Sequence, residues 1–135
     1  MMRIKAAIVA AAAVAGLAVA TAPAQASECK AEGGGRYICE YGVSEHQLPD
    51  GWREQFIIGT NYAVFTRAGV NGKWSKWQSL GGVARSQVYI ESGYQGGDFY
   101  TRVFVERRDG SNWQRIRPSL TKVWGPWEKS GGVKP

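Results

Sequence analysis

The stretch that decides the fold is WREQFIIGTNYAVFTRAGVNGKWSKWQSLGG, residues 52–82. It contains three runs in which aromatic and β-branched residues gather: 54–59, 62–67 and 73–80. Thr60-Asn61 separates the first two runs, and Gly81-Gly82 ends the third. Asn71-Gly72 is a hairpin-turn dipeptide, because both residues tolerate positive φ. The pattern predicts antiparallel β-strands that are joined by tight turns.

The same pattern continues toward the C-terminus. Further runs follow at 86–91, 99–107, 112–117 and 123–129. We expect a glycine-rich loop at 93–98 and a second hairpin turn at Asp109-Gly110. Pro126 lies inside the last run, so that run should be an edge strand or a bulge. Since no sustained helical apolar stripe is present, we predict an all-β domain over residues 51–135.

Residues 1–26 have the features of a cleavable secretory signal peptide. Arg3 and Lys5 provide a positive start, an apolar run rich in Ala and Val follows, and Ala24-Gln25-Ala26 is a small-x-small cleavage site. A retained membrane anchor is the less favoured alternative, because a bilayer span needs about 20 strongly apolar residues. We therefore expect a secreted, extracellular protein that begins at Ser27 and has no membrane span after cleavage.

Cys29 and Cys39 lie in the segment 27–50, which precedes the β domain. In an oxidising exterior these two cysteines are expected to form a disulfide. On the chain-entropy model it contributes roughly 2–3 kcal/mol to stability. A metal or redox pair is less favoured, because zinc sites take four ligands and the chain has a single histidine, His46. We expect no metal site and no cofactor.

Charge and motifs argue against two functional classes. The formal net charge is +6, and two of the positive charges belong to the expected signal peptide. Basic residues gather only at Arg107-Arg108 and 115–117, whereas a nucleic-acid binder concentrates them in a patch. An enzyme is not expected, because the chain has no nucleophile-elbow motif and its one histidine is interpreted as a surface residue.

Two approximate repeats organise the β domain. Phe65-Thr66-Arg67 precedes a hairpin turn and Trp74, and Tyr100-Thr101-Arg102 precedes a hairpin turn and Trp113. The segment WSKWQSLGG at 74–82 is echoed 50 residues later by WGPWEKSGG. Repeats of roughly 40–50 residues that are built from short strands are typical of propeller blades.

These motifs resemble a known family. The unit 52–82 resembles one blade of the bacterial β-propeller lectins that bind fucose and related sugars. The segments that match are Gly59-Thr60-Asn61, 65–67 and 74–82. Residues 83–132 resemble a diverged second blade. The resemblance implies two propeller-blade-like units and a ring that closes by homo-oligomerisation. A small β-sandwich or barrel is the alternative, because the Cys29–Cys39 segment has no place in the blade pattern.

The resemblance also implies a carbohydrate-binding, lectin-like function with a glycan or glycoconjugate as partner. The ligand-binding candidates are Arg67, Trp74, Trp77, Arg102 and Trp113. Aromatic rings pack against the C–H face of a pyranose, and polar groups bond its hydroxyls. Trp74 and Trp77 are three apart, so they should point to opposite faces unless a bulge intervenes. The alternative for each tryptophan is a place in the core.

A protein-binding role, such as inhibition of an extracellular enzyme, is the main rival. Exposed Trp, Tyr and Arg are also the residues that dominate binding energy at protein interfaces. An inhibitor should present one protruding loop, for which 93–98 and 45–51 are the candidates. A lectin should instead carry one pocket in each repeat.

We predict that Trp74→Ala and Trp113→Ala each weaken glycan binding without unfolding the protein, because a ring that stacks on a sugar does not support the core. Binding to a glycan array and circular dichroism of each variant check this prediction. Loss of the fold in both variants would place these rings in the core.

Overall fold

The computed structural model describes residues 26–130, so all of the expected signal peptide except Ala26 lies outside the described residues. The strands are β2 (Glu28–Lys30), β3 (Arg36–Ile38), β4 (Ser44–Gln47), β5 (Arg53–Ile58), β6 (Val64–Val70), β7 (Lys73–Trp74), β8 (Gln78–Gly81), β9 (Tyr89–Gln95), β10 (Asp98–Glu106), β11 (Asn112–Pro118) and β12 (Glu128–Lys129). A single 3-10 turn, η1 (Cys39–Tyr41), joins β3 to β4. The described residues contain no α-helix, and the predicted all-β class is confirmed.

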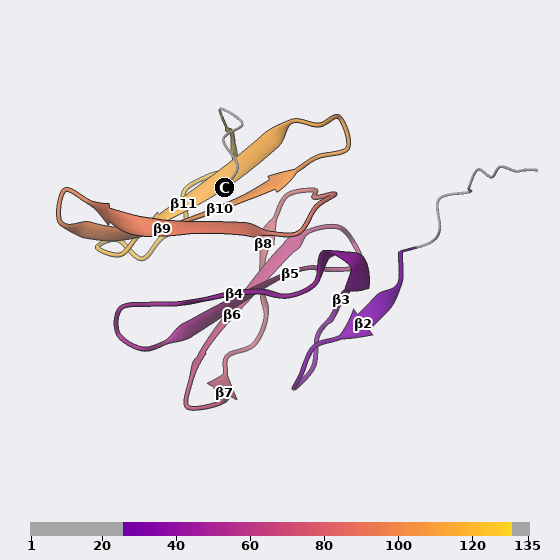
Figure 1. Cartoon of the computed structure of the whole chain (residues 1–135), viewed down its shortest axis with the longest axis horizontal. Helices are drawn as coiled ribbons and strands as arrows, with labels where there is room; N and C mark the ends of the chain where they lie inside the picture. The colour runs from indigo at the N-terminus through magenta and orange to yellow at the C-terminus, as the bar shows by residue number, and fades with distance from the viewer. Residues whose placement is uncertain (1–25, 131–135) are drawn as a thin grey trace, which may run out of the picture.

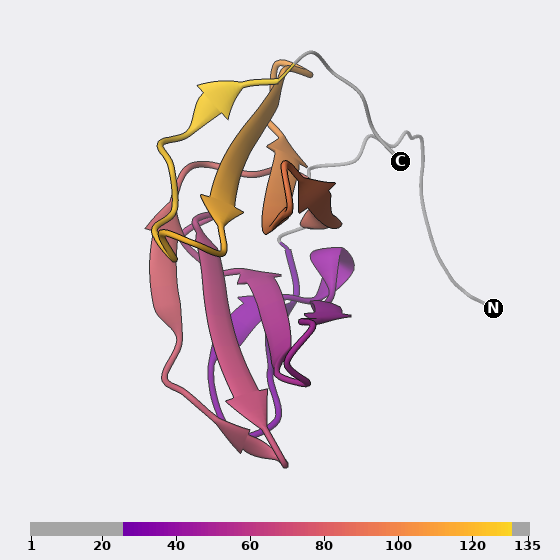
Figure 2. The same cartoon turned by 90° about the vertical axis from the view of Figure 1, so that its left-hand side faces the viewer.

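Among the described residues, two of the three sheets are antiparallel meanders, and the third is the β2–β3 hairpin. In the first meander β4, β5 and β6 are neighbours in order, and both β7 and β8 pair with β6. In the second meander the order is β9, β10, β11, β12. Figures 1 and 2 show the second meander above the first, with the hairpin beside the first. Within residues 26–130 none of the sheets closes into a barrel.

The core lies between the two meanders. Alternation along β5 and β6 turns Phe56, Ile58 and Val64 toward the second meander, where Val103 and Val105 of β10 meet them. The side chains of Phe56, Ile58 and Val64 are fully buried. Because both meanders contribute to one apolar cluster, neither sheet buries its inner face without the other.

The glycine-rich segment 93–98 is a hairpin and not the loop that its composition predicts. β9 continues to Gln95 and β10 begins at Asp98, so only Gly96 and Gly97 make the turn. Both glycines have positive φ, +60° and +83°. A two-residue turn of this kind suits the right-handed twist of the strands that it joins.

Residues 73–80 do not form one continuous strand. The run divides into β7 and β8, and the residues between them leave the sheet. The alternation expected of Trp74 and Trp77 holds only along an uninterrupted strand, so it does not apply here: the guanidinium of Arg67 contacts both rings, at 4.7 and 4.4 Å from their centroids. The run 123–129 likewise keeps only β12 as strand.

The N-terminal hairpin covers the outer face of the first meander. The predicted disulfide between Cys29 and Cys39 is present and ties β2 to the start of η1. At the tip of the hairpin, the Glu32 carbonyl accepts a hydrogen bond from Arg67 Nη2 at 2.8 Å, and the Gly34 carbonyl accepts one from Trp77 Nε1 at 2.9 Å. The β2–β3 hairpin is thus fastened by the disulfide and by hydrogen bonds at its tip.

We predict that Gly35→Ala destabilises the protein more than Gly34→Ala does. Both glycines have positive φ, but a Cβ at Gly35 would lie 2.2 Å from Trp77 Nε1, whereas nothing lies within 4 Å of a Cβ at Gly34. Since overpacking costs about 1–3 kcal/mol, urea unfolding should separate the two variants by that amount. Equal losses would mean that backbone strain alone requires glycine here.

Candidate functional site

Three of the residues predicted to bind ligand form one cluster: Arg67, Trp74 and Trp77. Only 5% of Arg67 is exposed. Besides its bond to the hairpin, its Nε donates to Gln55 Oε1 at 2.9 Å. The donors of this arginine therefore serve internal acceptors, and the cluster holds the N-terminal hairpin against β6.

The other two predicted residues lie elsewhere. Arg102 is on the outer face of β10, where it pairs with Glu91 of β9 at 3.2 Å. Trp113 is half-buried, and its Nε1 donates to Ser111 Oγ at 3.0 Å. With Trp127 and their neighbours, the Trp113 ring lines a small hollow of about 120 Å³. The three candidates of the first repeat therefore lie together, whereas the two candidates of the second repeat, Arg102 and Trp113, lie on opposite faces of their sheet.

A larger hollow, the inter-sheet cleft, opens between the two meanders. Its volume is about 610 Å³, which is within the range of small-molecule sites. The turn between β4 and β5, the tip of the β9–β10 hairpin and the segment after β11 meet around it. Among its lining residues are Trp52, Glu54, Tyr94, Asp98, Arg117 and Lys122.

A buried ion pair forms the floor of the inter-sheet cleft. Arg117 of β11 donates through Nη1 to Glu54 Oε2 at 2.5 Å and through Nη2 to Glu54 Oε1 at 2.8 Å. His46, expected from the sequence to be a surface residue, is instead largely buried: its side chain is 12% exposed and its Nε2 lies 2.8 Å from Glu54 Oε1. Arg117 also donates to Thr101 Oγ1 at 3.2 Å. Only 3% of Glu54 is exposed.

Opposing effects act on the Glu54 carboxyl. Burial raises its pKa, but the hydrogen bonds and charges of Arg117 and His46 outweigh burial, and the pKa lies below its ordinary value. Glu54 is therefore a carboxylate at neutral pH. The floor of the cleft consists of charged groups that point in fixed directions.

Two exposed aromatic rings stand at the rim of the inter-sheet cleft. Trp52 is 41% exposed and Tyr94 is 68% exposed. The Trp52 backbone is held in a tight turn, because its N–H donates to Asp50 Oδ1 at 3.1 Å and its carbonyl accepts from Leu48. The Tyr94 ring packs edge-on against Phe99 with 5.3 Å between centroids. The Trp52 backbone and the Tyr94 ring are thus held by contacts within the protein.

The ligand contacts expected from the sequence do not include Trp52, Glu54, Tyr94 or Arg117. A signal for Trp52 was present, since the turn-forming residues Pro49, Asp50 and Gly51 place the following side chain near a loop tip. No local signal joins Glu54 to Arg117, because the two residues are 63 positions apart. The glycine-rich composition of 93–98 predicts a loop, so it does not indicate that Tyr94 lies on a strand.

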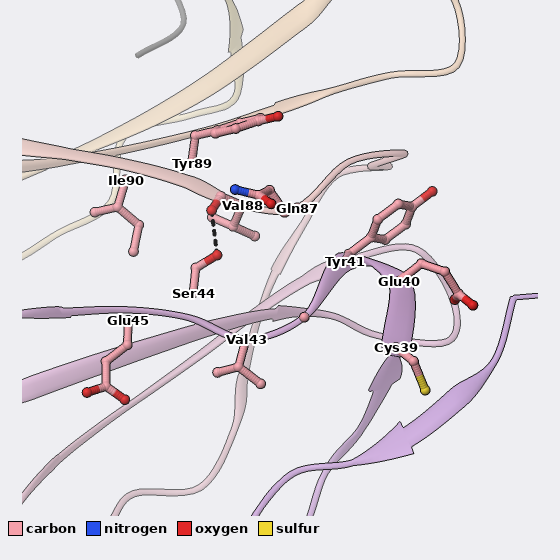
Figure 3. A pocket seen from close by; sticks show the side chains of 11 residues that line it. Cys39, Glu40, Tyr41, Val43, Ser44, Glu45, Gln87, Val88, Tyr89 and Ile90 are labelled. Atoms are coloured by element: carbon pink, nitrogen blue, oxygen red, sulfur yellow. Dashed lines mark hydrogen bonds between the residues drawn. The ribbon is translucent and has the colours of Figure 1, made fainter.

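A second hollow, the β4–β9 trough, lies between η1–β4 and residues 87–90 (Figure 3). Its volume is about 550 Å³, and Ser44 Oγ donates across it to the Val88 carbonyl at 2.6 Å. The rings of Tyr41 and Tyr89 line it, and Tyr89 stacks on Phe104. Because the trough has no tryptophan and no cation in its lining, we take the inter-sheet cleft as the candidate functional site.

Comparison with known protein families finds no match, and no curated protein is detectably similar to this chain. Among residues 26–130, the structure contains no helix of the length and apolar character that would cross a membrane. The function is therefore argued from the chemistry of the site.

We predict that Glu54→Gln lowers the free energy of unfolding by about 3–5 kcal/mol at pH 7, because it leaves the Arg117 charge buried without its partner. The loss should shrink in acid. The folded-state pKa of Glu54 lies below its unfolded value of about 4.3, so its stabilisation is present above that value and is lost as pH falls through the folded pKa.

Urea unfolding of both proteins between pH 7 and pH 3 measures this difference. Glu45→Gln is the matched control, since Glu45 pairs with Arg53 at the surface, and such pairs contribute at most about 1 kcal/mol. A Glu54→Gln loss that is as small as that of the control, or that is independent of pH, would contradict the prediction.

Proposed function

We propose that the protein is a secreted carbohydrate-binding, lectin-like protein and that the inter-sheet cleft is its sugar site. The observation that carries this proposal is the placement of Trp52 and Tyr94 at the rim of a cleft with a charged floor. Flat rings pack against the C–H face of a pyranose, while ionised groups make strong hydrogen bonds to its hydroxyls.

The geometry suits a small polar ligand. Trp52 belongs to the first meander and Tyr94 to the second, so a ligand between the rings would contact both sheets. Asp98 and Lys122 line the same cleft and add a hydrogen-bond acceptor and a donor. This combination of apolar faces and convergent polar groups is typical of ligand pockets.

We extend the proposal to the two blade-like units, 52–82 and 83–132. Each meander is a set of up-and-down antiparallel strands, which is compatible with a propeller blade. The two Trp-x-x-Trp segments also make similar contacts: Trp77 Nε1 donates to the Gly34 carbonyl, and Trp127 Nε1 donates to the Leu80 carbonyl. These correspondences support two related units, which would form a ring by homo-oligomerisation.

A specific observation favours protein binding as the second candidate. Leu120 is 83% exposed and Val123 is 65% exposed, and both follow β11 beside the inter-sheet cleft. Exposed apolar patches that polar residues surround often mark protein interfaces. The segments 93–98 and 45–51, expected as inhibitory loops, also contribute residues to the cleft. Both candidate functions therefore use the same edge of the molecule.

We predict that Trp52→Ala and Tyr94→Ala each weaken glycan binding about tenfold, which corresponds to about 1.4 kcal/mol of lost contact. The measurement is a glycan array followed by titration of the best ligand with the protein that begins at Ser27. Trp74→Ala and Trp113→Ala, which the sequence repeats predict to weaken binding, remove aromatic rings that do not line the cleft; as matched controls they leave binding unchanged if the cleft is the sugar site.

Loss of binding in the controls alone would show that the sugar site lies at Trp74 or Trp113 and not in the cleft. Binding to no glycan, together with capture of an extracellular enzyme that Leu120→Ser abolishes, would favour the protein-binding role.

A further inference from the structure

Ser27, the first residue after the expected cleavage site, is held at both of its backbone polar groups. Its nitrogen lies 3.1 Å from Glu40 Oε1 and 3.4 Å from Glu40 Oε2. Its carbonyl accepts a hydrogen bond from the Cys39 N–H at 2.9 Å. Both partners belong to η1, so the two contacts fix this residue against one short turn.

The surroundings of Glu40 hold the carboxylate in place. Cys39 is bonded to Cys29, and Glu28 pairs with Ile38 in the hairpin, so the chain on either side of the contact is fastened. In Figure 3 the Glu40 carboxylate points away from the Ser44–Val88 contact, toward the side where β2 runs.

Hydrogen bonding favours the ionised form of Glu40. The bond from its own backbone N–H is the largest cause that lowers the pKa of Glu40; burial opposes this effect, and the hydrogen bonds from Ser27 add to it. The acceptor that faces the Ser27 nitrogen is therefore negatively charged at neutral pH.

We propose that Glu40 is the receptor for the N-terminal ammonium that forms when the chain is cut between Ala26 and Ser27. The inference rests on the proposed secretion and is independent of sugar binding. A signal peptidase would hydrolyse the Ala26–Ser27 amide with one water molecule, giving the hydroxyl to Ala26 and a hydrogen to the Ser27 nitrogen. The new amine then takes up a proton from solvent.

Cleavage changes the contact from a hydrogen bond into an ion pair. Before cleavage the Ser27 nitrogen is a neutral amide with one N–H; afterwards it is an ammonium with three donors that faces two carboxylate oxygens. The pair fastens the hairpin that supplies the acceptors for Arg67 and Trp77. Processing at this bond thus adds an ion pair to a hairpin that already covers the first meander.

The test compares four proteins: one that begins at Ser27, one that begins at Ala26, and the Glu40→Gln variant of each. The measured quantity is the rate at which a small acylating reagent modifies the terminal amine at pH 7, read from the mass of the N-terminal peptide. A carboxylate partner raises the pKa of an α-amino group above its ordinary range of about 7.7–8.0, and an increase of half a unit to one unit slows labelling about three- to tenfold.

We expect the Ser27 protein to be labelled about three- to tenfold more slowly than its Glu40→Gln variant. The Ala26 protein and its variant should be labelled at equal rates, because their amine lies one residue away from Glu40. Since the pair is exposed, 1 M salt should remove the difference. Circular dichroism of each protein confirms that Glu40→Gln leaves the fold intact.

Two results would overturn the inference. Equal labelling of the Ser27 protein and its variant would show that the ammonium is not paired with Glu40. An intact mass showing that the exported chain begins at a residue other than Ser27 would show that this terminus does not form. Neither result bears on the inter-sheet cleft, so the sugar-binding proposal is judged separately.

Discussion

The ion pair between Glu54 and Arg117 joins the two meanders at the point where the inter-sheet cleft begins. Apolar contacts between the sheets are non-directional, whereas two parallel N–H···O bonds require one orientation of β11 over β5. Removing two charges from water is costly, and additional hydrogen bonds from His46 and to Thr101 offset part of that cost. The shape of the cleft and the positions of its rim residues therefore depend on this pair.

Arginine has a second structural use in this protein. The guanidinium of Arg67 contacts two indole rings, that of Arg117 lies 4.7 Å from the Trp124 ring, and that of Arg115 donates to the Leu80 carbonyl. A planar cation can stack on a ring and still donate in its own plane. The protein thereby accommodates large aromatic side chains between sheets that are too small to surround them with aliphatic groups alone.

Local features of the fold were predictable from the sequence, and features that depend on pairing between distant segments were not. Thr60-Asn61 and Asn71-Gly72 correctly mark the turns on either side of β6, since turn chemistry is local. The alternation rule does not apply at Trp74 and Trp77 because the chain leaves the sheet between β7 and β8, and Arg67 on the neighbouring strand then contacts both rings. A glycine-rich composition at 93–98 did not distinguish a loop from a two-residue turn.

The candidate site was less predictable for the same reason. Its floor pairs residues from different meanders, and no local pattern reports that the inner faces of β5 and β11 meet. The five residues chosen from the repeats are aromatic and basic, as a sugar site requires, but stacking between aromatic and basic side chains also builds the interior. Residue type alone does not show whether an aromatic or basic side chain binds sugar or packs in the interior. Its exposure does, but exposure is a property of the folded chain.

Burial of the stacked arginines also limits how much of the positive charge is exposed at the surface. Arg67 is almost wholly buried, and the side chains of Arg102 and Arg117 are only 19% and 17% exposed, each beside a carboxylate. These cations contribute to the isoelectric point but present little charge to an approaching polyanion. The net charge still sets the long-range field, but direct ion pairing with an anionic surface is limited to the basic side chains that remain exposed.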